Sequence, residues 1–585
     1  MAIFTPSESP SITVKEVDLS GVVPNVQTST GAIVGNFNWG PVELAQKISN
    51  ESLLASTFGS PDSDNSVDFH SAAYFLRYSN SLQVVRMCNG AENASDALAD
   101  AETLVIKNRA DWDAQLTARD AADHTFIAKY PGDIGNSIRV SILQSDSSGS
   151  SSVFNANTEM VNNFDGAPGT STFASGISAS NDEIHVIVVD SDGELSGDRG
   201  TILETFPFLS MAKNAKSDDG SSNFVRDVIN NSSQYVWLAG KGDEGSFSSQ
   251  AVGNKNFLDA TNGVDFAGSK GVVSIPMTTG IKSSALTTGN YASGHDLFED
   301  VDTIEVDMLI APGMTSTSDH TTVVNDLVAT AQTLRKDCVV VASAPSRTDI
   351  IGIPAVTANA NAITRANSFT RSSYLFVDNN YLKVYDKYND QYIEIPAASS
   401  TAGIFAATDA VAAPWFSPAG PRRGQYLGIT ALNYSPTKSQ RDALYKASVN
   451  PISNIPGQGV LLFGDKTKLA RPSAFDRINV RRLFLGIERA IAIAARNVMF
   501  EFNDEFTRSE FTNIVEPFLR EIQGRRGITD FRVVCDDTNN TAAVIDRNEF
   551  IANIFIKPAR SINFVTLNFV AVRTGVAFEE VVGTV

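Results

Sequence analysis

The last hundred residues place the strongest constraint on what this chain can fold into. Two long helical patterns come first, RPSAFDRINVRRLFLGIERAIAIAARNVMFEFND (471–504) and FTRSEFTNIVEPFLREIQGRRG (506–527). Three strand-like runs follow, ITDFRVVCDD (528–537), NEFIANIFIKPA (548–559) and SINFVTLNFVAV (561–572). Long periodic segments followed by short runs of β-branched and aromatic residues are typical of a domain that mixes helices with a sheet. The sequence therefore predicts a C-terminal α/β domain, which we bound at 401–574.

Length and composition indicate a multidomain globular protein. The chain has 585 residues, and 42% of them are hydrophobic, so it can bury several cores. Its three cysteines (Cys88, Cys338 and Cys535) are odd in number and far apart, which favours neither a disulfide framework nor a metal knuckle. The first residues show no charged segment followed by an apolar one, and no run of about 18 apolar residues occurs. We therefore expect no signal peptide and no membrane insertion.

Charge is distributed unevenly along the chain. The formal net charge is −20, yet residues 421–585 contain 22 Lys and Arg against 17 Asp and Glu, a net of +5. The other 420 residues carry a net of −25. An acidic body disfavours direct binding of nucleic acid, because phosphate contacts need clustered Lys and Arg. A mildly basic C-terminal domain could instead face an acidic protein surface.

The two ends of the chain read as extended arms, residues 1–20 and 575–585. Near the start, SITVKEVDL alternates polar and apolar residues, and after Gly575 the chain ends in a strand-like tail. A strand at a chain end must join a sheet to satisfy its backbone, and that sheet can belong to its own chain or to a neighbour. The side chains that would anchor these arms are Ile12, Val14, Val17, Val576, Phe578 and Val581.

Between the arms we expect a middle α/β domain, formed by residues 21–90 and 200–400, with a mostly β insertion at 91–199. TIEVDMLIAPG (303–313), a helix at 319–337 and CVVVASAPS (338–346) predict a βαβ unit with parallel strands. Residues 372–397 predict a hairpin that turns at Asp378. The insertion is rich in Ala, Asp, Ser, Asn and Gly, which suits a solvent-facing domain.

Motifs for catalysis, metal or cofactor binding are weak throughout. GVLLFGDKT (459–467) misses a phosphate loop because Asp465 separates the second glycine from the lysine, so a strand ending in a turn is favoured. APGMTSTSDH (311–320) fits an ordinary helix cap better than an anion site. The acidic turns near Asp190 and Asp218 do not complete a calcium loop, and no GxSxG occurs. We predict no enzyme activity, cofactor or metal.

The C-terminal region resembles the core domain of contractile tail sheath proteins, found in contractile-tailed bacteriophages and related injection machines. The resemblance is carried by PFLREIQGRRGI (517–528), FRVVCDDTNNT (531–541) and IFIKPARSINFVTLNFV (554–570). A Pro/Gly-rich junction at 413–429 and the turn and helix at 28–61 extend it, so that it covers residues 10–80 and 300–574. It implies an α+β multidomain fold in which strand arms complete the core sheets of neighbouring subunits by β-augmentation.

The resemblance also implies a function. Copies of the chain would polymerise around a tail tube, and contraction would drive the tube through the host envelope during genome delivery. The implied partners are further copies, the tube, baseplate and tail terminator proteins; the implied location is the virion, after assembly in the host cytoplasm. The sheath of another contractile machine (a secretion system or bacteriocin) remains an alternative, as does an α/β enzyme built on the βαβ unit.

Five arginines are candidates for contact with such a tube. Two turns of helix return a side chain to nearly the same face, so arginines spaced by seven predict a basic stripe opposite Ile478, Leu485, Ile491 and Val498. Two more arginines mark the turn after the second helix. The alternative is a solvated face paired with Glu488 and Glu501. The candidates are Arg482, Arg489, Arg496, Arg525 and Arg526.

Overall fold

The computed structural model describes residues 29–96, 105–115, 125–145, 151–239, 257–268 and 271–563. The chain divides into two compact units, which we describe separately. The first, here called the body, comprises residues 26–414 and 418–486. The second, here called the C-terminal unit, begins at Ile487 and includes Trp415–Ser417. The boundary between the two falls inside one helix, α15 (Ile478–Arg496).

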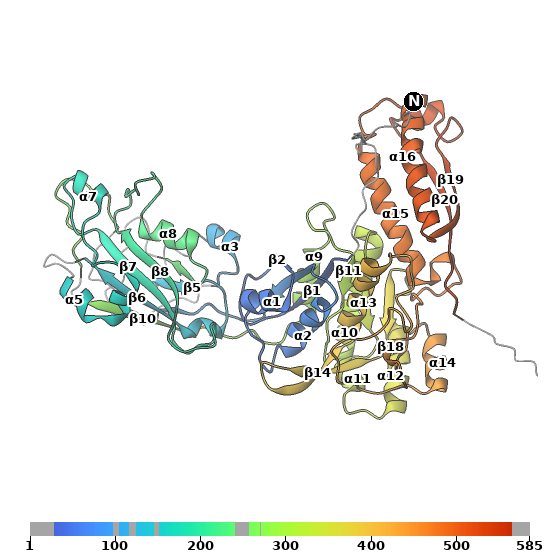
Figure 1. Ribbon diagram of the computed structural model, residues 1–585, viewed down its shortest axis with the longest axis horizontal. Coiled ribbons are helices and arrows are strands. Elements are labelled where there is room, and N and C mark those ends of the chain that lie inside the picture. Colours follow the sequence, from blue (N-terminus) through green and yellow to red (C-terminus); the bar gives the residue numbers. More distant parts are fainter. Residues whose placement is uncertain are drawn as a thin grey trace, which may run out of the picture. The chain divides into compact units, whose positions relative to one another are not determined.

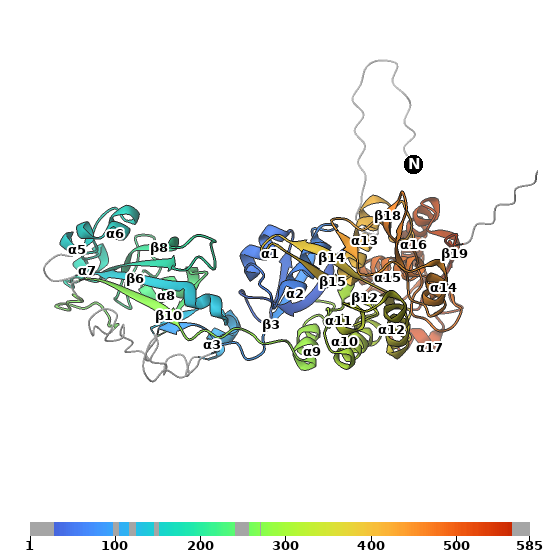
Figure 2. The same cartoon turned by 90° about the horizontal axis from the view of Figure 1, so that it is seen from below.

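A six-stranded sheet is the centre of the body, as Figures 1 and 2 show. Five of its strands are parallel, and one edge strand is antiparallel. In spatial order the strands are β13 (Leu375–Asp378), β12 (Val339–Ser343), β11 (Met308–Ile310), β1 (Gly31–Asn36), β3 (Leu82–Met87) and β2 (Ala45–Ile48).

Helices cover both faces of this sheet, because successive side chains of a strand point to opposite faces. Ile33 and Val341 pack into one core with α2 (Ser66–Leu76) and α13 (Ala398–Val411). Val34 and Val340 pack into the other core with α9 (Thr288–Asp296), α10 (Thr317–Ala329) and α12 (Ala355–Ser368). The predicted βαβ unit is confirmed, since β11 and β12 are parallel and α10 connects them. Asn50 caps the start of α1 (Glu51–Phe58), where its side chain accepts a hydrogen bond of 2.8 Å from Leu53 N.

The hairpin predicted to turn at Asp378 is wrong. The strand before Asp378 joins the parallel sheet, whereas the hairpin is formed by the next two strands, β14 (Tyr381–Asp386) and β15 (Gln391–Pro396). Asn379 and Asn380 are buried, and their side chains donate to Tyr434 Oη (2.9 Å) and Tyr434 O (2.7 Å). A polar Asp-Asn-Asn run usually marks an exposed turn, but here it passes through the interior and makes tertiary hydrogen bonds.

The insertion folds as one antiparallel sheet of seven strands, on the side of the body opposite to α12 and α14 (Figures 1 and 2). The predicted boundary at residue 199 falls between β7 (Glu183–Asp190) and β8 (Thr201–Ser210), which pair with each other. The last strand, β10 (Val272–Thr278), returns from far along the sequence to pair with β6 (Ile138–Gln144). The strands, in spatial order, are β8 (Thr201–Ser210), β7 (Glu183–Asp190), β6 (Ile138–Gln144), β10 (Val272–Thr278), β4 (Ser95–Asp96), β5 (Phe126–Ala128) and β9 (Val236–Leu238). Its helices are α3 (Arg109–Ala114), α5 (Ser151–Ala156), α6 (Thr158–Asn163), α7 (Thr172–Gly176) and α8 (Val225–Ser232).

The rest of the body is built from short elements. After α10 the chain makes a π-helix, Thr330–Arg335, then α11 (Arg347–Ile350) before α12. Later come β16 (Ala431–Leu432), α14 (Lys438–Lys446), β17 (Ile452–Ile455) and β18 (Gly459–Leu462). The C-terminal unit contains the end of α15, then α16 (Glu505–Gly524), β19 (Ile528–Val534), α17 (Ala542–Ile545) and β20 (Asn553–Pro558).

Candidate assembly surface

The described part of the C-terminal unit contains a small sheet whose outer edges have no strand partner within that part. β19 and β20 pair antiparallel, and each has only the other as a partner among the described residues. Phe511, Val515 and Leu519 of α16 are buried within the unit, whereas Phe555 of β20 is 59% exposed. A two-stranded ladder is marginally stable in water, and its free N–H and C=O groups can accept another strand. The sheet is therefore suited to strand addition from outside.

A cluster of exposed apolar side chains occupies the connection between α15 and α16. Met499, Phe500, Phe502 and Phe506 all expose more than half of their surface, and Phe500 is fully exposed. Phe500 also has a φ of 70°, a left-handed conformation that is costly for an aromatic residue. Large apolar side chains concentrated in this way are typical of a protein–protein contact. The sequence analysis did not single them out, although four such residues within eight positions were visible in it.

The arm residues Ile12, Val14, Val17, Val576, Phe578 and Val581 lie outside the described residues, as does most of the third predicted strand, 561–572. The unpaired edges seen in β19 and β20 among the described residues and the strand-like sequences of the arms are thus two independent findings, and no contact between them is described. Their pairing stays a prediction.

The predicted arginine stripe is wrong at its first member. Arg482 is buried in the body and pairs with Asp409, a residue of α13 that the sequence analysis missed, while its guanidinium lies 5.1 Å from the Phe405 ring centroid. Because α15 packs on α13 here, the helix face that appears polar in sequence is covered by tertiary structure. Arg489 is half-buried and Arg496 is exposed, so only the C-terminal half of the stripe reaches the surface.

The two arginines at the turn after α16 are exposed. Arg525 forms an ion pair with Glu521 (3.5 Å), and its guanidinium lies 5.1 Å from the ring of Trp415. Trp415 Nε1 in turn donates to Arg525 O at 3.1 Å, which fixes the junction segment within the C-terminal unit. Arg526 adopts a φ of 67° at this turn. Arg525 therefore has a structural role within the unit, and contact of these two arginines with a tube stays a prediction.

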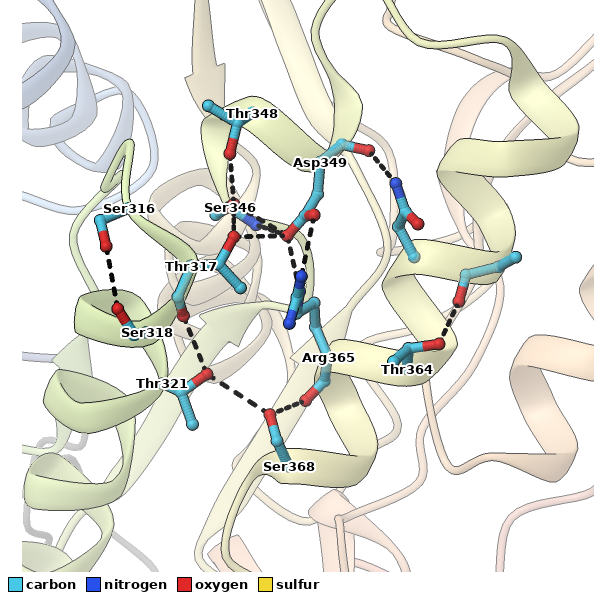
Figure 3. Close-up of polar contacts among 12 residues, drawn as sticks. Ser316, Thr317, Ser318, Thr321, Ser346, Thr348, Asp349, Thr364, Arg365 and Ser368 are labelled. Carbon is cyan, nitrogen blue, oxygen red and sulfur yellow. Dashed lines mark hydrogen bonds and ion pairs between the residues drawn. The ribbon is translucent and has the colours of Figure 1, made fainter.

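The carboxyl edge of the parallel sheet, where an α/β enzyme would bind its ligand, is occupied by a self-contained polar network (Figure 3). Arg365 Nε donates to Asp349 Oδ2 at 2.9 Å, and the same oxygen accepts from Ser346 Oγ at 2.8 Å. Asn361 donates to the Asp349 carbonyl at 3.0 Å. These bonds tie α11 to α12, so the charged groups serve each other rather than an incoming ligand.

The other weak motifs have structural roles as well. Lys466 of the near-miss phosphate loop donates to Tyr445 O (2.8 Å). Asp190 is buried and accepts from Gly193 N (3.0 Å) and Ser196 N (2.7 Å), which closes its acidic turn without a cation. Within the described ranges, no group of three His, Cys, Asp or Glu side chains could hold a metal ion, and no helix has the length and apolarity of a membrane span.

Strongly shifted pKa values also belong to core residues rather than to a cleft. Burial raises the pKa of Asp378 to about 7, against hydrogen bonds from Ser343, Asn380 and Thr401 that lower it. Burial lowers the pKa of His295 to about 3. Perturbed groups mark active sites only when they face a ligand-accessible space, and both residues are buried in the packed body.

Comparisons with known proteins bear on the whole chain. Residues 470–571 match the phage tail sheath C-terminal domain, and residues 285–468 match the phage tail sheath protein central domain. The tail sheath protein of Enterobacteria phage T4 is 33% identical, in an alignment that covers 98% of this chain and 99% of that protein. The tail sheath protein of Vibrio phage KVP40 is 32% identical with the same coverage.

Solved structures support the fold. The crystal structure of the sheath tail protein from Listeria innocua aligns with a TM-score of 0.54 at 12% identity, covering 92% of this chain and 93% of that one. The sheath tail protein from Desulfitobacterium hafniense aligns with a TM-score of 0.51 at 14% identity, covering 94% and 100%. The predicted α+β multidomain class agrees with both.

Proposed function

The chain belongs to the family of phage tail sheath proteins, as the resemblance of its C-terminal residues predicted, and from this premise we propose how it works as a contractile tail sheath subunit. Copies assemble around a tail tube in a metastable extended array, and contraction of the array drives the tube through the host envelope. The family is a structural one, and the polar network at the sheet edge needs no substrate to explain it. The sheath of a secretion system or bacteriocin remains the second candidate.

The observation that carries this proposal is the incomplete C-terminal sheet. Among the described residues β19 and β20 pair only with each other, so each has an edge to which a further strand could add, and the arms at 1–20 and 575–585 have strand-like sequences. We propose that arms of neighbouring copies add to these edges, so that main-chain hydrogen bonds connect the subunits. An arm that donates to one neighbour while the core accepts from another is a head-to-tail contact, which generates a helical array.

The domain roles follow from this arrangement. The C-terminal unit would form the inner layer of the sheath around the tube, and the seven-stranded insertion would form the outer decoration. The remaining candidates for contact with an acidic tube surface are the half-buried Arg489 and the exposed Arg496, Arg525 and Arg526. Baseplate and terminator proteins would bind at the two ends of the array. We place the array in the virion, after assembly in the host cytoplasm.

Electron microscopy of the purified chain tests the proposal. We expect striated hollow tubes from the full-length chain and folded monomers from a chain that lacks residues 1–20. The matched control lacks an exposed body turn with the same net charge of −2, residues 218–222, and should still polymerise. Tubes at wild-type yield from the arm deletion would refute strand exchange, and a full-length chain that stays monomeric even with tube protein added would count against the sheath mechanism.

A further inference from the structure

A cluster of basic side chains surrounds the C-terminal end of α14 in the body. Lys466 Nζ donates to Tyr445 O at 2.8 Å, and Lys468 Nζ donates to Ala447 O at 2.7 Å. Arg477 Nη1 donates to Tyr445 Oη at 2.8 Å. The free carbonyls of a helix C-terminus attract cations, so these groups are held there by the helix itself. We define the basic patch as Arg371, Lys446, Lys466, Lys468 and Arg477.

The basic patch has more positive charge than its own surroundings neutralise. Burial and then the nearby Arg477 lower the pKa of Lys466. Burial and then Arg371 lower the pKa of Lys468 to about 8. Each lysine is thus next to another cation that opposes its charge. An incoming anionic surface would relieve this repulsion.

Two nearby carboxylates, Asp476 and Asp465, raise the pKa of Lys466, but they are fewer than the five cations of the basic patch. Asp465 pairs with Arg477 at 3.5 Å and is itself buried. Arg371 and Lys446 are exposed, and neither forms an ion pair with any described residue. Two cations of the basic patch are therefore free to meet a partner.

The charge of the chain indicates what that partner is. Residues 421–486, which supply most of the basic patch, hold 11 Lys and Arg against 3 Asp and Glu, a net of +8. Residues 91–281, which contain the inserted sheet, hold 12 Lys and Arg against 26 Asp and Glu, a net of −14. The same chain thus carries two segments of opposite net charge, and complementary charge fixes partner and register at interfaces.

The two segments are not positioned to meet within one copy. In both views of the body, the inserted sheet lies on one side of the six-stranded sheet and α14 on the other (Figures 1 and 2). A contact between them therefore requires a second copy. Its exposed carboxylates include Asp192 and Glu194, in the loop between β7 and β8.

From these observations we propose that the basic patch docks the acidic inserted domain of a second copy of this chain, as a lateral contact of the sheath. The proposal rests on the proposed function, since it concerns contacts within the array. It adds a side-chain interface, sensitive to salt, to the main-chain contacts of the strand arms.

The test reverses the two exposed charges of the basic patch, R371E with K446E, in the full-length chain. We expect the concentration of unassembled chain in equilibrium with tubes to rise about tenfold at low salt, because each pair loses attraction and gains repulsion. Raising the NaCl concentration to 0.5 M should narrow the difference from wild type, since salt screens exposed charges. K438E, at the exposed first position of α14, is the matched control and should have little effect. Thermal unfolding of each variant verifies that it is folded.

A compensating variant identifies the occupant. D192K with E194K, added to the reversed patch, should restore most of the lost assembly, whereas the control reversal D218K should not. An unchanged assembly in R371E/K446E, or a loss that the compensating pair leaves as it was, overturns the proposal. Binding of a short duplex DNA by the wild-type chain that the reversals abolish would assign the patch to nucleic acid instead. If the wild-type chain forms no tubes, the proposed function fails on its own, and light scattering of pairwise association with the same variants decides the patch.

Discussion

Asp378 should make the stability of the body depend on pH in a predictable direction. Its side chain is fully buried at the end of β13, where Oδ2 accepts from Thr401 Oγ1 at 3.0 Å and Oδ1 accepts from Asn380 N at 3.3 Å. Burial raises its pKa from 3.8 to about 7, so the folded body keeps the carboxyl protonated where the unfolded chain has released the proton. Stability from this group is therefore full at low pH and is lost as pH rises from about 4 to about 7.

The magnitude follows from the two pKa values. Between pH 5.5 and pH 8, the linkage relation gives a loss of about 2 kcal/mol from Asp378 alone, or about 30-fold in the equilibrium constant for opening. Asp378→Asn cannot ionise, so the difference between wild type and this variant isolates the carboxyl from every other titrating group. The Asn380 and Thr401 hydrogen bonds can be retained, because the amide oxygen accepts from the former and Thr401 Oγ1 can accept from the amide nitrogen.

Labelling of Cys338 provides the assay. This thiol is fully buried immediately before β12, a strand of the same sheet as Asp378, so it reacts only when the body opens. With Cys88 and Cys535 replaced by serine, we expect the labelling rate of wild type relative to Asp378→Asn to rise about 30-fold from pH 5.5 to pH 8. Asp442→Asn, exposed on α14, is the control whose ratio to wild type should stay constant. A flat ratio for Asp378→Asn would refute the reasoning.

Three further substitutions in the body can be measured in the same way. Arg482→Met should destabilise the body by about 3–5 kcal/mol, because it breaks the buried ion pair with Asp409, and the double change with Asp409→Leu should recover most of the loss; a double variant as unstable as the single one would contradict this. His295→Phe should slow Cys338 labelling about fivefold, because neither ring nitrogen has a hydrogen-bond partner among the described residues, and faster labelling would count against it. Arg86→Lys should destabilise the body by about 2 kcal/mol and speed the proteolytic release of the insertion. The reason is that the Arg86 guanidinium donates hydrogen bonds both to Gly40 O, outside the insertion, and to Pro131 O (2.5 Å), within it. Unchanged proteolysis would show that these bonds do not hold the insertion in place.

Periodic patterns were sufficient for the regular elements. The βαβ unit at 303–346 was predictable because a buried parallel strand is a continuous apolar run and a covering helix repeats every 3.6 residues. The start of α1 was predictable because a cap depends only on residues a few positions apart, Asn50 and Leu53. Family membership followed from the order of motifs at 517–570, which few other chains would share.

The sequence-based predictions were wrong where a polar side chain forms its hydrogen bonds or ion pairs with residues distant in the sequence. Asp378, Asn379 and Asn380 have the composition of a turn, yet they are buried. The side chains of Asn379 and Asn380 bond to Tyr434, more than fifty positions away, and that of Asp378 bonds to Thr401. Arg482 has the spacing of a surface stripe, yet it meets Asp409, which is 73 residues earlier. Local patterns describe a helix face but not what packs against it.

The sequence by itself determined the helices, the parallel strands, the caps and the family, since these depend on periodicity, local hydrogen bonding and motif order. Only the tertiary structure decided which charges are buried, which strand edges are left open and where the inserted sheet closes. Those properties depend on contacts between segments that are distant in the sequence. The free energy of burying a charge or pairing a strand depends on which partner group packs against it in the folded chain. The open edges of β19 and β20 and the basic patch around α14 belong to this second class, and both of our proposals rest on them.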